Sequence, residues 1–244
     1  MASPPRVGAT RAEAGLTLDH AAGESVGVTD RRVVRLATGA DLRLTNASAP
    51  RMVICLNGGQ GTEVAGTWSA SLELLVKRLA PRFPQLGFGE VRYRIKSWRR
   101  LELCIEDARA AIDAAGGEST LLVGFSMGGA VAIAVADDPR VVGVLGLAPW
   151  IYDRLDLTPL TGKRLDVLHG SLDRWLPRIP GVSPVLSRRG FERAQALGVP
   201  GSYRLIGAGV HGVALRAPTG MLIPLPRARA WLRLVAAQLE EFAG

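Results

Sequence analysis

Cysteine is scarce in this chain of 244 residues, which contains only Cys55 and Cys104. No pair of cysteines has the CxxC spacing, so the sequence supports neither a disulfide framework nor a cysteine-based zinc site. We expect Cys55 to lie in a strand and Cys104 in a helix. We expect the protein to use neither a metal nor a cofactor.

Long hydrophobic runs are also missing. No stretch approaches the roughly 18 uninterrupted apolar residues that a membrane-spanning helix needs, and the opening residues are polar, without an apolar signal-peptide core. We therefore expect a cytoplasmic protein with no membrane partner. Residues 1–30 show little periodicity and predict a flexible N-terminal arm, whereas residues 31–244 predict one domain.

Lysine occurs only three times, and the net charge of +8 comes almost entirely from arginine. Arginine is spread along the whole chain rather than gathered in one stripe, so we expect no nucleic-acid partner. The densest cationic stretch contains Lys96, Arg99 and Arg100. If this stretch borders the site, it would attract an anionic substrate; the alternative is an ordinary solvated start of a helix. The sequence does not indicate an oligomeric state.

The distribution of apolar residues predicts the fold class. Residues 31–45 predict an antiparallel hairpin that turns at Thr38 and Gly39. Beyond it, apolar runs alternate with amphipathic stretches, which predicts an α/β fold with a mostly parallel sheet and helices on both faces. Strands are expected at 52–56, 91–94, 120–124, 141–147, 164–168 and 202–206, and helices at 72–79, 101–115, from 127, around 191–197 and at 231–242.

The pattern GxSxG surrounds Ser126 and separates an apolar strand from a predicted helix. A serine in this context sits on a strained turn that lifts its hydroxyl above the edge of the sheet. Gly124 and Gly128 would let the backbones of strand and helix cross closely. A turn that needed only an N-capping serine would not require both glycines. The pattern therefore predicts that Ser126 is a nucleophile.

A serine hydroxyl needs a base to accept its proton at neutral pH, and histidine suits this role. Of the three histidines, His211 lies in a glycine-rich loop that follows the last predicted strand. His169 adjoins the strand 164–168 and is expected to pack or form hydrogen bonds locally, and His20 falls in the predicted arm. His211 is therefore the predicted general base.

An acid is needed to orient the imidazole and to stabilise its protonated form. Asp173 lies on the loop that leaves the strand 164–168 and is the predicted acid. Asp153 and Asp156 follow the preceding strand and remain alternatives. Asp166 lies inside a predicted strand and should point elsewhere.

Two backbone N–H groups could stabilise the oxyanion that forms during acyl transfer. One belongs to Met127, directly after the predicted nucleophile, and the other to the glycine-rich stretch 57–61 after the first buried strand. Gly59 is the preferred second donor because glycine lets the backbone approach a substrate closely. Gln60 is the alternative.

From about Met52 onward, the chain resembles the α/β-hydrolase superfamily, which has the same order of oxyanion loop, serine elbow, HGxxD loop and final histidine. The elbow GFSMGG is similar to that of small serine esterases and dienelactone-hydrolase-like members. The resemblance implies an α/β-hydrolase fold, here with a minimal cap, because only a short loop spans 149–164. Two positions depart from relatives: Asn57 replaces a common histidine, and Ser126 replaces the cysteine of dienelactone hydrolases proper.

These features predict a serine hydrolase that cleaves a small or moderately sized carboxylic ester or thioester through an acyl-enzyme. Its partner would be a small-molecule acyl substrate. Trp150 and Ile151 are candidate walls of the acyl pocket, and the alternative is that Trp150 only packs the loop. Acyltransferase, perhydrolase and peptidase activities on the same triad are alternatives, as is a non-catalytic ligand-binding protein of this fold.

Overall fold

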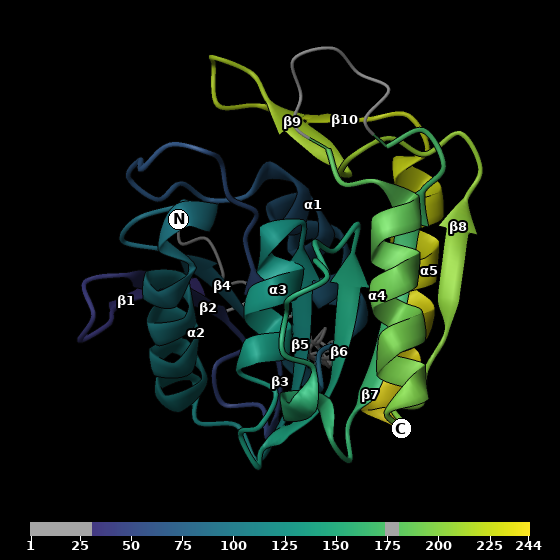
Figure 1. Cartoon of the computed structure of the whole chain (residues 1–244). Coiled ribbons are helices and arrows are strands. Elements are labelled where there is room, and N and C mark those ends of the chain that lie inside the picture. The colour runs from purple at the N-terminus through teal and green to yellow at the C-terminus, as the bar shows by residue number, and fades with distance from the viewer. Residues whose placement is uncertain (1–30, 174–180) are drawn as a thin grey trace, which may run out of the picture.

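The computed structural model of the protein describes residues 31–173 and 181–244. An eight-stranded sheet forms the centre of this part of the chain (Figure 1). The strands lie in the order β1-β2-β4-β3-β5-β6-β7-β8. β2 is antiparallel to both of its neighbours, and β3 to β8 run parallel to one another. The strands are β1 (Arg31–Arg35), β2 (Asp41–Thr45), β3 (Arg51–Leu56), β4 (Leu86–Arg92), β5 (Ser119–Phe125), β6 (Val141–Leu147), β7 (Arg164–Gly170) and β8 (Tyr203–Ile206).

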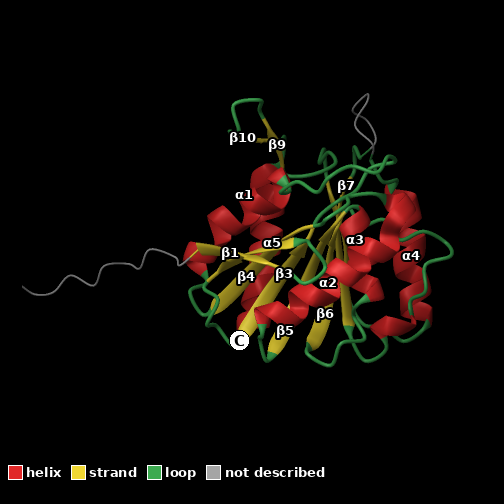
Figure 2. Ribbon diagram, turned by 90° about the vertical axis from the view of Figure 1, so that its left-hand side faces the viewer, coloured by secondary structure: helices red, strands yellow, loops and turns green. Residues whose placement is uncertain are grey.

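Helices cover both faces of this sheet (Figures 1 and 2). α2, α3 and α4 pack on one face and α1 and α5 on the other, each face with its own hydrophobic core. The helices are α1 (Ala70–Leu79), α2 (Leu101–Ala115), α3 (Met127–Ala134), α4 (Pro184–Ala196) and α5 (Ala228–Ala243), with short 3₁₀ turns at Ala80–Arg82, Trp98–Arg100 and Thr158–Leu160. None of the helices in the described ranges is long and apolar enough to cross a membrane.

α2 illustrates how the sequence specifies these elements. Its buried side chains recur at helical spacing, at Cys104, Ala108, Ile112 and Ala115, so that one face of the helix packs on the sheet. The helix ends at Gly116, whose φ of 68° is a left-handed conformation that glycine adopts without strain. The helix predicted at 101–115 is therefore confirmed.

The opening hairpin and the mostly parallel, helix-covered sheet are also confirmed. β4, however, begins at Leu86, five residues before the strand expected at 91–94. The sequence reading missed its first half because Gly87 and Gly89 weaken the strand pattern. These glycines have a packing role: a Cβ at Gly87 would lie 2.3 Å from the Met52 Sδ, and one at Gly89 would lie 2.7 Å from the Ile54 Cδ1.

The loops that leave β3, β5, β7 and β8 meet at one edge of the sheet, because the carboxyl ends of parallel strands point the same way. A small hairpin, β9 (Ala214–Arg216) and β10 (Leu222–Pro224), stands at this end of the molecule (Figure 1). The sequence did not predict it. Residues 149–163 contain only a 3₁₀ turn, which agrees with the expected minimal cap. The predicted arm, residues 1–30, lies outside the described residues.

Candidate active site

Ser126 occupies a strained turn between β5 and α3. Its φ of 56° and ψ of −119° are unusual for any residue other than glycine. A Cβ at Gly124 would lie 2.4 Å from the Gly128 carbonyl oxygen, and one at Gly128 would lie 2.1 Å from the Leu56 carbonyl oxygen. Both flanking glycines are therefore needed where β3, β5 and α3 approach one another, as the motif predicted.

His211 and Asp173 form a hydrogen-bonded pair at the same edge of the sheet. His211 Nδ1 lies 2.7 Å from Asp173 Oδ2, and the aspartate side chain is fully buried. The loops that carry them are joined through Ser171: its N–H donates to the Ile206 carbonyl at 2.9 Å, and its hydroxyl accepts from the Ala208 N–H at 2.9 Å. Asp173 and His211 are thus held together by contacts between their loops as well as by their own bond.

Asp173 remains ionised despite its burial. Burial alone would raise the pKa of this carboxyl group, but hydrogen bonds from His169 and His211 outweigh it and bring the pKa below its ordinary value. The second carboxylate oxygen, Oδ1, accepts a hydrogen bond from the Val182 N–H at 3.1 Å. At neutral pH the group is therefore a carboxylate that can orient an imidazole.

His211 lies beside the serine elbow. Its ring centroid is 5.0 Å from that of Phe125, the residue that precedes Ser126, with the rings tilted by 35°. Among the described residues, no hydrogen bond joins the Ser126 hydroxyl to the His211 ring. Catalytic hydrogen bonds are commonly long or poorly aligned in unliganded enzymes and tighten when substrate binds.

The alternative acids have other partners. Asp153 pairs with Arg189 at 2.7 Å, and Asp156 accepts hydrogen bonds from the N–H and hydroxyl groups of Thr158 at 3.0 Å and 2.9 Å. Asp166, which was expected to point elsewhere, accepts from the Ser202 hydroxyl at 2.6 Å. Within the described ranges, only Asp173 among the candidate acids contacts a histidine.

The predicted oxyanion donors lie next to the nucleophile. Met127 is the first residue of α3, so its N–H has no acceptor within the helix. Gly59 lies against it, since a Cβ there would be 2.2 Å from the Met127 Sδ, and a Cβ at Gly58 would be 3.3 Å from the Ser126 Cβ. The N–H of Gln60 is the alternative donor, and the carbonyl oxygen of the same residue accepts a hydrogen bond from the Trp98 N–H at 3.2 Å.

A cavity of about 290 Å³ opens above Ser126. Its described lining comprises Gly59, Trp98, Ser126, Met127, Trp150, Gly181, Val182, Ser183 and Leu186. Trp150 is a wall, as expected, but Ile151 is not: it is fully buried, and a Cβ at Gly190 would lie 2.3 Å from its side chain. Trp98 was missed as a wall because the sequence reading treated its stretch by charge alone.

A larger hollow of about 800 Å³ lies at the opposite end of the sheet, near Arg51, Ser119 and Arg164 at the starts of β3, β5 and β7. None of the candidate catalytic residues lines it. Ligand sites in parallel sheets form at the carboxyl ends of the strands, so we assign the site to the smaller cavity.

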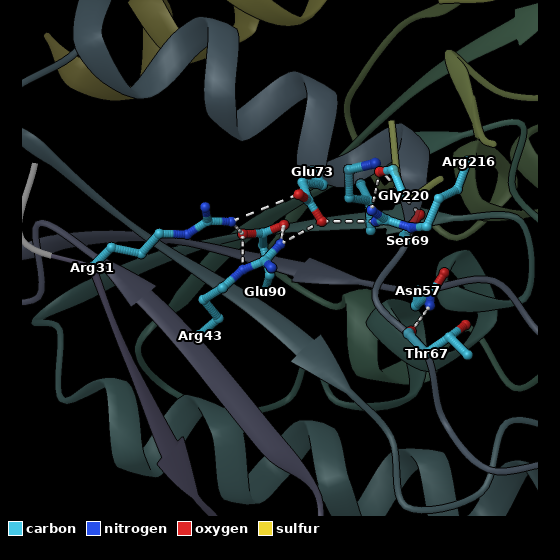
Figure 3. Close-up of polar contacts among 10 residues, drawn as sticks. Arg31, Arg43, Asn57, Thr67, Ser69, Glu73, Glu90, Arg216 and Gly220 are labelled. Atoms are coloured by element: carbon cyan, nitrogen blue, oxygen red, sulfur yellow. Dashed lines mark hydrogen bonds and ion pairs between the residues drawn. The ribbon is translucent and has the colours of Figure 1, made fainter. Parts of the chain in front are cut away.

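A partly buried ionic cluster lies beside the loop between β3 and α1 (Figure 3). Arg43 donates from Nε to Glu90 at 2.8 Å and from Nη2 to Glu73 at 3.0 Å, and Arg216 donates to the same Glu73 oxygen at 2.8 Å. The Arg43 guanidinium also lies 4.4 Å from the centre of the Trp68 ring, within the loop. The cluster therefore joins β2, β4, α1 and β9.

Asn57 closes the part of this loop that carries Gly59. Its side-chain amide donates to the Thr67 carbonyl at 2.7 Å (Figure 3). The residue that replaces the common histidine of relatives thus has a structural partner, which fixes the two ends of the stretch 57–67 relative to each other.

The cationic stretch borders the cavity through Trp98, but its side chains differ in their surroundings. Arg100 forms ion pairs with Glu63 and Glu102. Lys96 donates to the Thr67 hydroxyl at 2.9 Å, and burial lowers the pKa of its ammonium group. Arg99 is exposed and has no ion-pair partner among the described residues.

A model of the alpha/beta hydrolase family matches residues 53–242. Comparison with curated proteins gave no match. A solved structure of MGS-M1, an alpha/beta hydrolase enzyme from a Medee basin deep-sea metagenome library, is similar with a TM-score of 0.64 at 16% identity, covering 87% of this chain and 98% of that chain. The Pyrococcus furiosus esterase Pf2001 gives a TM-score of 0.59 at 13% identity, with coverages of 88% and 89%.

Est1E from Butyrivibrio proteoclasticus is similar with a TM-score of 0.59 at 12% identity, covering 87% of this chain and 98% of that chain. At these identities the likeness concerns the fold. The family model, in contrast, matches most of the sequence and includes the elbow, the acid loop and the final histidine. The chain therefore belongs to the alpha/beta hydrolase family.

Proposed function

We propose that the protein is a serine hydrolase that cleaves a small or moderately sized carboxylic ester or thioester through an acyl-enzyme. The observation that carries this proposal is the convergence of a strained Ser126 and a hydrogen-bonded His211–Asp173 pair on one edge of the sheet. Ser126 is the proposed nucleophile, His211 the general base and Asp173 the orienting acid. The esterase relatives of the same fold agree with this chemistry.

The tautomer of His211 defines the first step. Because Nδ1 faces the Asp173 carboxylate, Nδ1 carries the proton and Nε2 is free to accept one. The Ser126 oxygen attacks the acyl carbon while its proton passes to His211 Nε2. The negative charge that develops on the former carbonyl oxygen is stabilised by the N–H groups of Met127 and Gly59.

The tetrahedral intermediate then collapses. The bond to the leaving alkoxide or thiolate breaks, and the leaving group takes the proton from His211, which leaves an ester on Ser126. Water attacks this ester and gives a proton to His211. The bond between the acyl carbon and the Ser126 oxygen then breaks, this oxygen takes the proton back from His211, and the carboxylic acid is released. An alcohol, an amine or a peroxide in place of water would make the protein an acyltransferase or a perhydrolase, and an amide substrate would make it a peptidase.

The cavity favours an apolar acyl group. Its walls include the indoles of Trp98 and Trp150 and the aliphatic side chains of Val182 and Leu186. Apolar walls with few polar groups are typical of sites that recognise hydrocarbon surface. A volume of about 290 Å³ is small for a ligand pocket, which favours short acyl chains.

Covalent labelling tests the nucleophile. A fluorophosphonate should react once per chain, and mass spectrometry of the digested protein should locate the adduct on Ser126. Ser126→Ala should prevent labelling, whereas Ser119→Ala, at the other end of the same strand, should not. An adduct on another residue, or equal labelling of Ser126→Ala, would overturn the proposal. Absence of labelling in a folded protein would favour a non-catalytic ligand-binding role.

A further inference from the structure

His169, the last residue but one of β7, is fully buried next to the proposed acid. Its Nε2 lies 2.9 Å from Asp173 Oδ2 and 3.0 Å from the Val182 carbonyl oxygen. Both of these atoms are hydrogen-bond acceptors, so Nε2 must carry a proton whatever the charge of the ring. His169 therefore donates a hydrogen bond to Asp173.

The other side of the His169 ring is also held. Its Nδ1 lies 2.7 Å from the hydroxyl oxygen of Ser187 on α4, which lies 2.9 Å from the hydroxyl oxygen of Tyr203 on β8. The Tyr203 hydroxyl also donates to the Pro184 carbonyl at 3.0 Å. These contacts, which start from two elements outside the acid and base loops, prevent the imidazole from rotating away from Asp173.

Both histidines contact the same carboxylate oxygen of Asp173. His211 Nδ1 and His169 Nε2 lie 2.7 Å and 2.9 Å from the same oxygen, Oδ2 of Asp173. A carboxylate oxygen that already accepts one N–H has less electron density to offer a second donor. His169 thus competes with His211 for the charge that would stabilise the protonated base.

We propose that His169 is a positioning residue of this site: through Asp173 it fixes the orientation of His211 and lowers the pH at which His211 loses its proton. The catalytic meaning of this role rests on the proposed function, but the electrostatic coupling does not. Ser187 and Tyr203 extend the arrangement to α4 and β8.

Other ionisable groups around this arrangement are few among the described residues. Tyr203 faces it from β8, and Arg188 on α4 lies with its guanidinium 4.2 Å from the centre of the Tyr203 ring. Burial raises the pKa of the Tyr203 hydroxyl, and the negative charges of Asp173 and of Glu192, also on α4, act in the same direction. The variants below leave Arg188, Glu192 and Tyr203 in place, so a change in the titration of His211 reports on His169.

The test is an NMR titration of the full chain labelled with ¹⁵N-histidine. The sequence contains only three histidines, and His20→Gln and His211→Gln assign the signals. In His169→Leu, the signals of His211 should titrate at a pH higher by about half a unit or more, which is about threefold in proton affinity. In His169→Gln, whose amide can donate from nearly the same place as Nε2, the midpoint should return toward that of the wild type.

An unchanged or lowered midpoint in His169→Leu, or equal midpoints in the Leu and Gln variants, would overturn the proposal. If His169→Leu does not fold, Ser187→Ala replaces it, because loss of the group that orients the His169 ring should move the midpoint in the same direction by a smaller amount. No movement of the midpoint in a folded Ser187→Ala would then overturn it.

Kinetics give a second readout. With a short-chain ester, His169→Leu should lower kcat about tenfold, because the lost orientation of Asp173 and His211 should outweigh the stronger charge interaction of His211 with Asp173. KM should change little, because His169 is fully buried and does not touch the substrate. In an Asp173→Asn background the same substitution should cost less than twofold, since its effect passes through Asp173. Equal losses in both backgrounds would indicate a structural role only. The NMR titration needs no turnover, so it decides the proposal even if Ser126 is not the nucleophile.

Discussion

His211 Nδ1 lies 2.7 Å from Asp173 Oδ2, although 38 positions separate these residues in the sequence. The loops after β7 and β8 bring them together because the two strands are parallel neighbours. The contact leaves Nε2 of His211 as the atom able to accept a proton, which the proposed role of His211 as general base for Ser126 requires.

Replacement of the acid should cripple turnover without unfolding the protein. Asp173→Asn should lower kcat/KM by about 10³- to 10⁴-fold, because an amide can stabilise the wrong imidazole tautomer and cannot stabilise a protonated His211. Asp153→Asn, at an exposed acid that pairs with Arg189, is the matched control and should change the rate less than about twofold. A larger loss in Asp153→Asn or Asp156→Asn would move the acid to the earlier loop.

The buried carboxylate should also make stability depend on pH. The pKa of Asp173 is lower in the folded protein than in the unfolded chain, so its stabilising contribution is fully present above the unfolded value of about 4 and is lost as pH falls through the folded pKa. Other carboxylates with lowered pKa, including Glu73 and Asp138, contribute in the same direction.

The comparison with Asp173→Asn isolates this contribution. The variant removes the titrating group, so the Tm of the wild type should fall more steeply than that of the variant as pH is lowered below about 4. Thermal unfolding of both proteins at a series of pH values measures the difference. Parallel curves would show that Asp173 does not contribute to acid sensitivity.

Much of the fold could be predicted from local pattern. Apolar spacing and the terminal Gly116 predict the helix at 101–115, and two glycines around Ser126 predict the elbow. β4 was partly missed because its glycines pack tightly against side chains of β3, a tertiary requirement that local propensity does not reveal. The short hairpin β9–β10 was missed because three-residue strands carry too little pattern.

Contacts that depend on tertiary packing were also missed in the site. Glycine spacing, chain order and strand ends predicted Ser126, Asp173 and His211 as the site, and the structure brings Asp173 and His211 into contact. Ile151 was misplaced in the acyl pocket, because a one-residue step along a loop decides whether a side chain faces the core or the cavity. The bond from His169 to Asp173 depends on packing between β7, α4 and β8. Sequence adjacency alone could suggest a local contact but not the shared oxygen.

The two indoles in the cavity should set the length of acyl chain that the protein accepts. With p-nitrophenyl esters of increasing chain length, kcat/KM of the wild type should peak at short chains. Trp98→Ala and Trp150→Ala should each move the peak to longer chains, because each removes a wall of the cavity. Val142→Ala, at an exposed residue at the start of β6, is the control and should leave the profile unchanged. An unaltered profile in both tryptophan variants would place the acyl group elsewhere.

We further propose that Lys96 and Arg99 attract anionic substrates. If they do, kcat/KM for an anionic ester should fall with rising ionic strength more steeply than for a neutral ester of equal acyl length. Lys96→Gln/Arg99→Gln should remove most of this difference. Arg100→Gln is the control, because Arg100 is paired with Glu63 and Glu102 and should contribute little. Equal salt dependence for both esters in the wild type would contradict the idea.

The proposed mechanism requires an acyl-enzyme on Ser126, and pre-steady-state kinetics can detect it. When the wild-type protein is mixed rapidly with an excess of a short-chain p-nitrophenyl ester, we predict a burst of p-nitrophenol close to one equivalent per chain, together with a mass increase of one acyl group located on Ser126. The burst appears when deacylation is slower than acylation. If deacylation is the faster step, added hydroxylamine should intercept the acyl-enzyme and release the acyl group as a hydroxamic acid. A Ser126→Ala protein that still shows the acyl adduct and retains more than about a tenth of the wild-type rate would show that Ser126 is not the nucleophile.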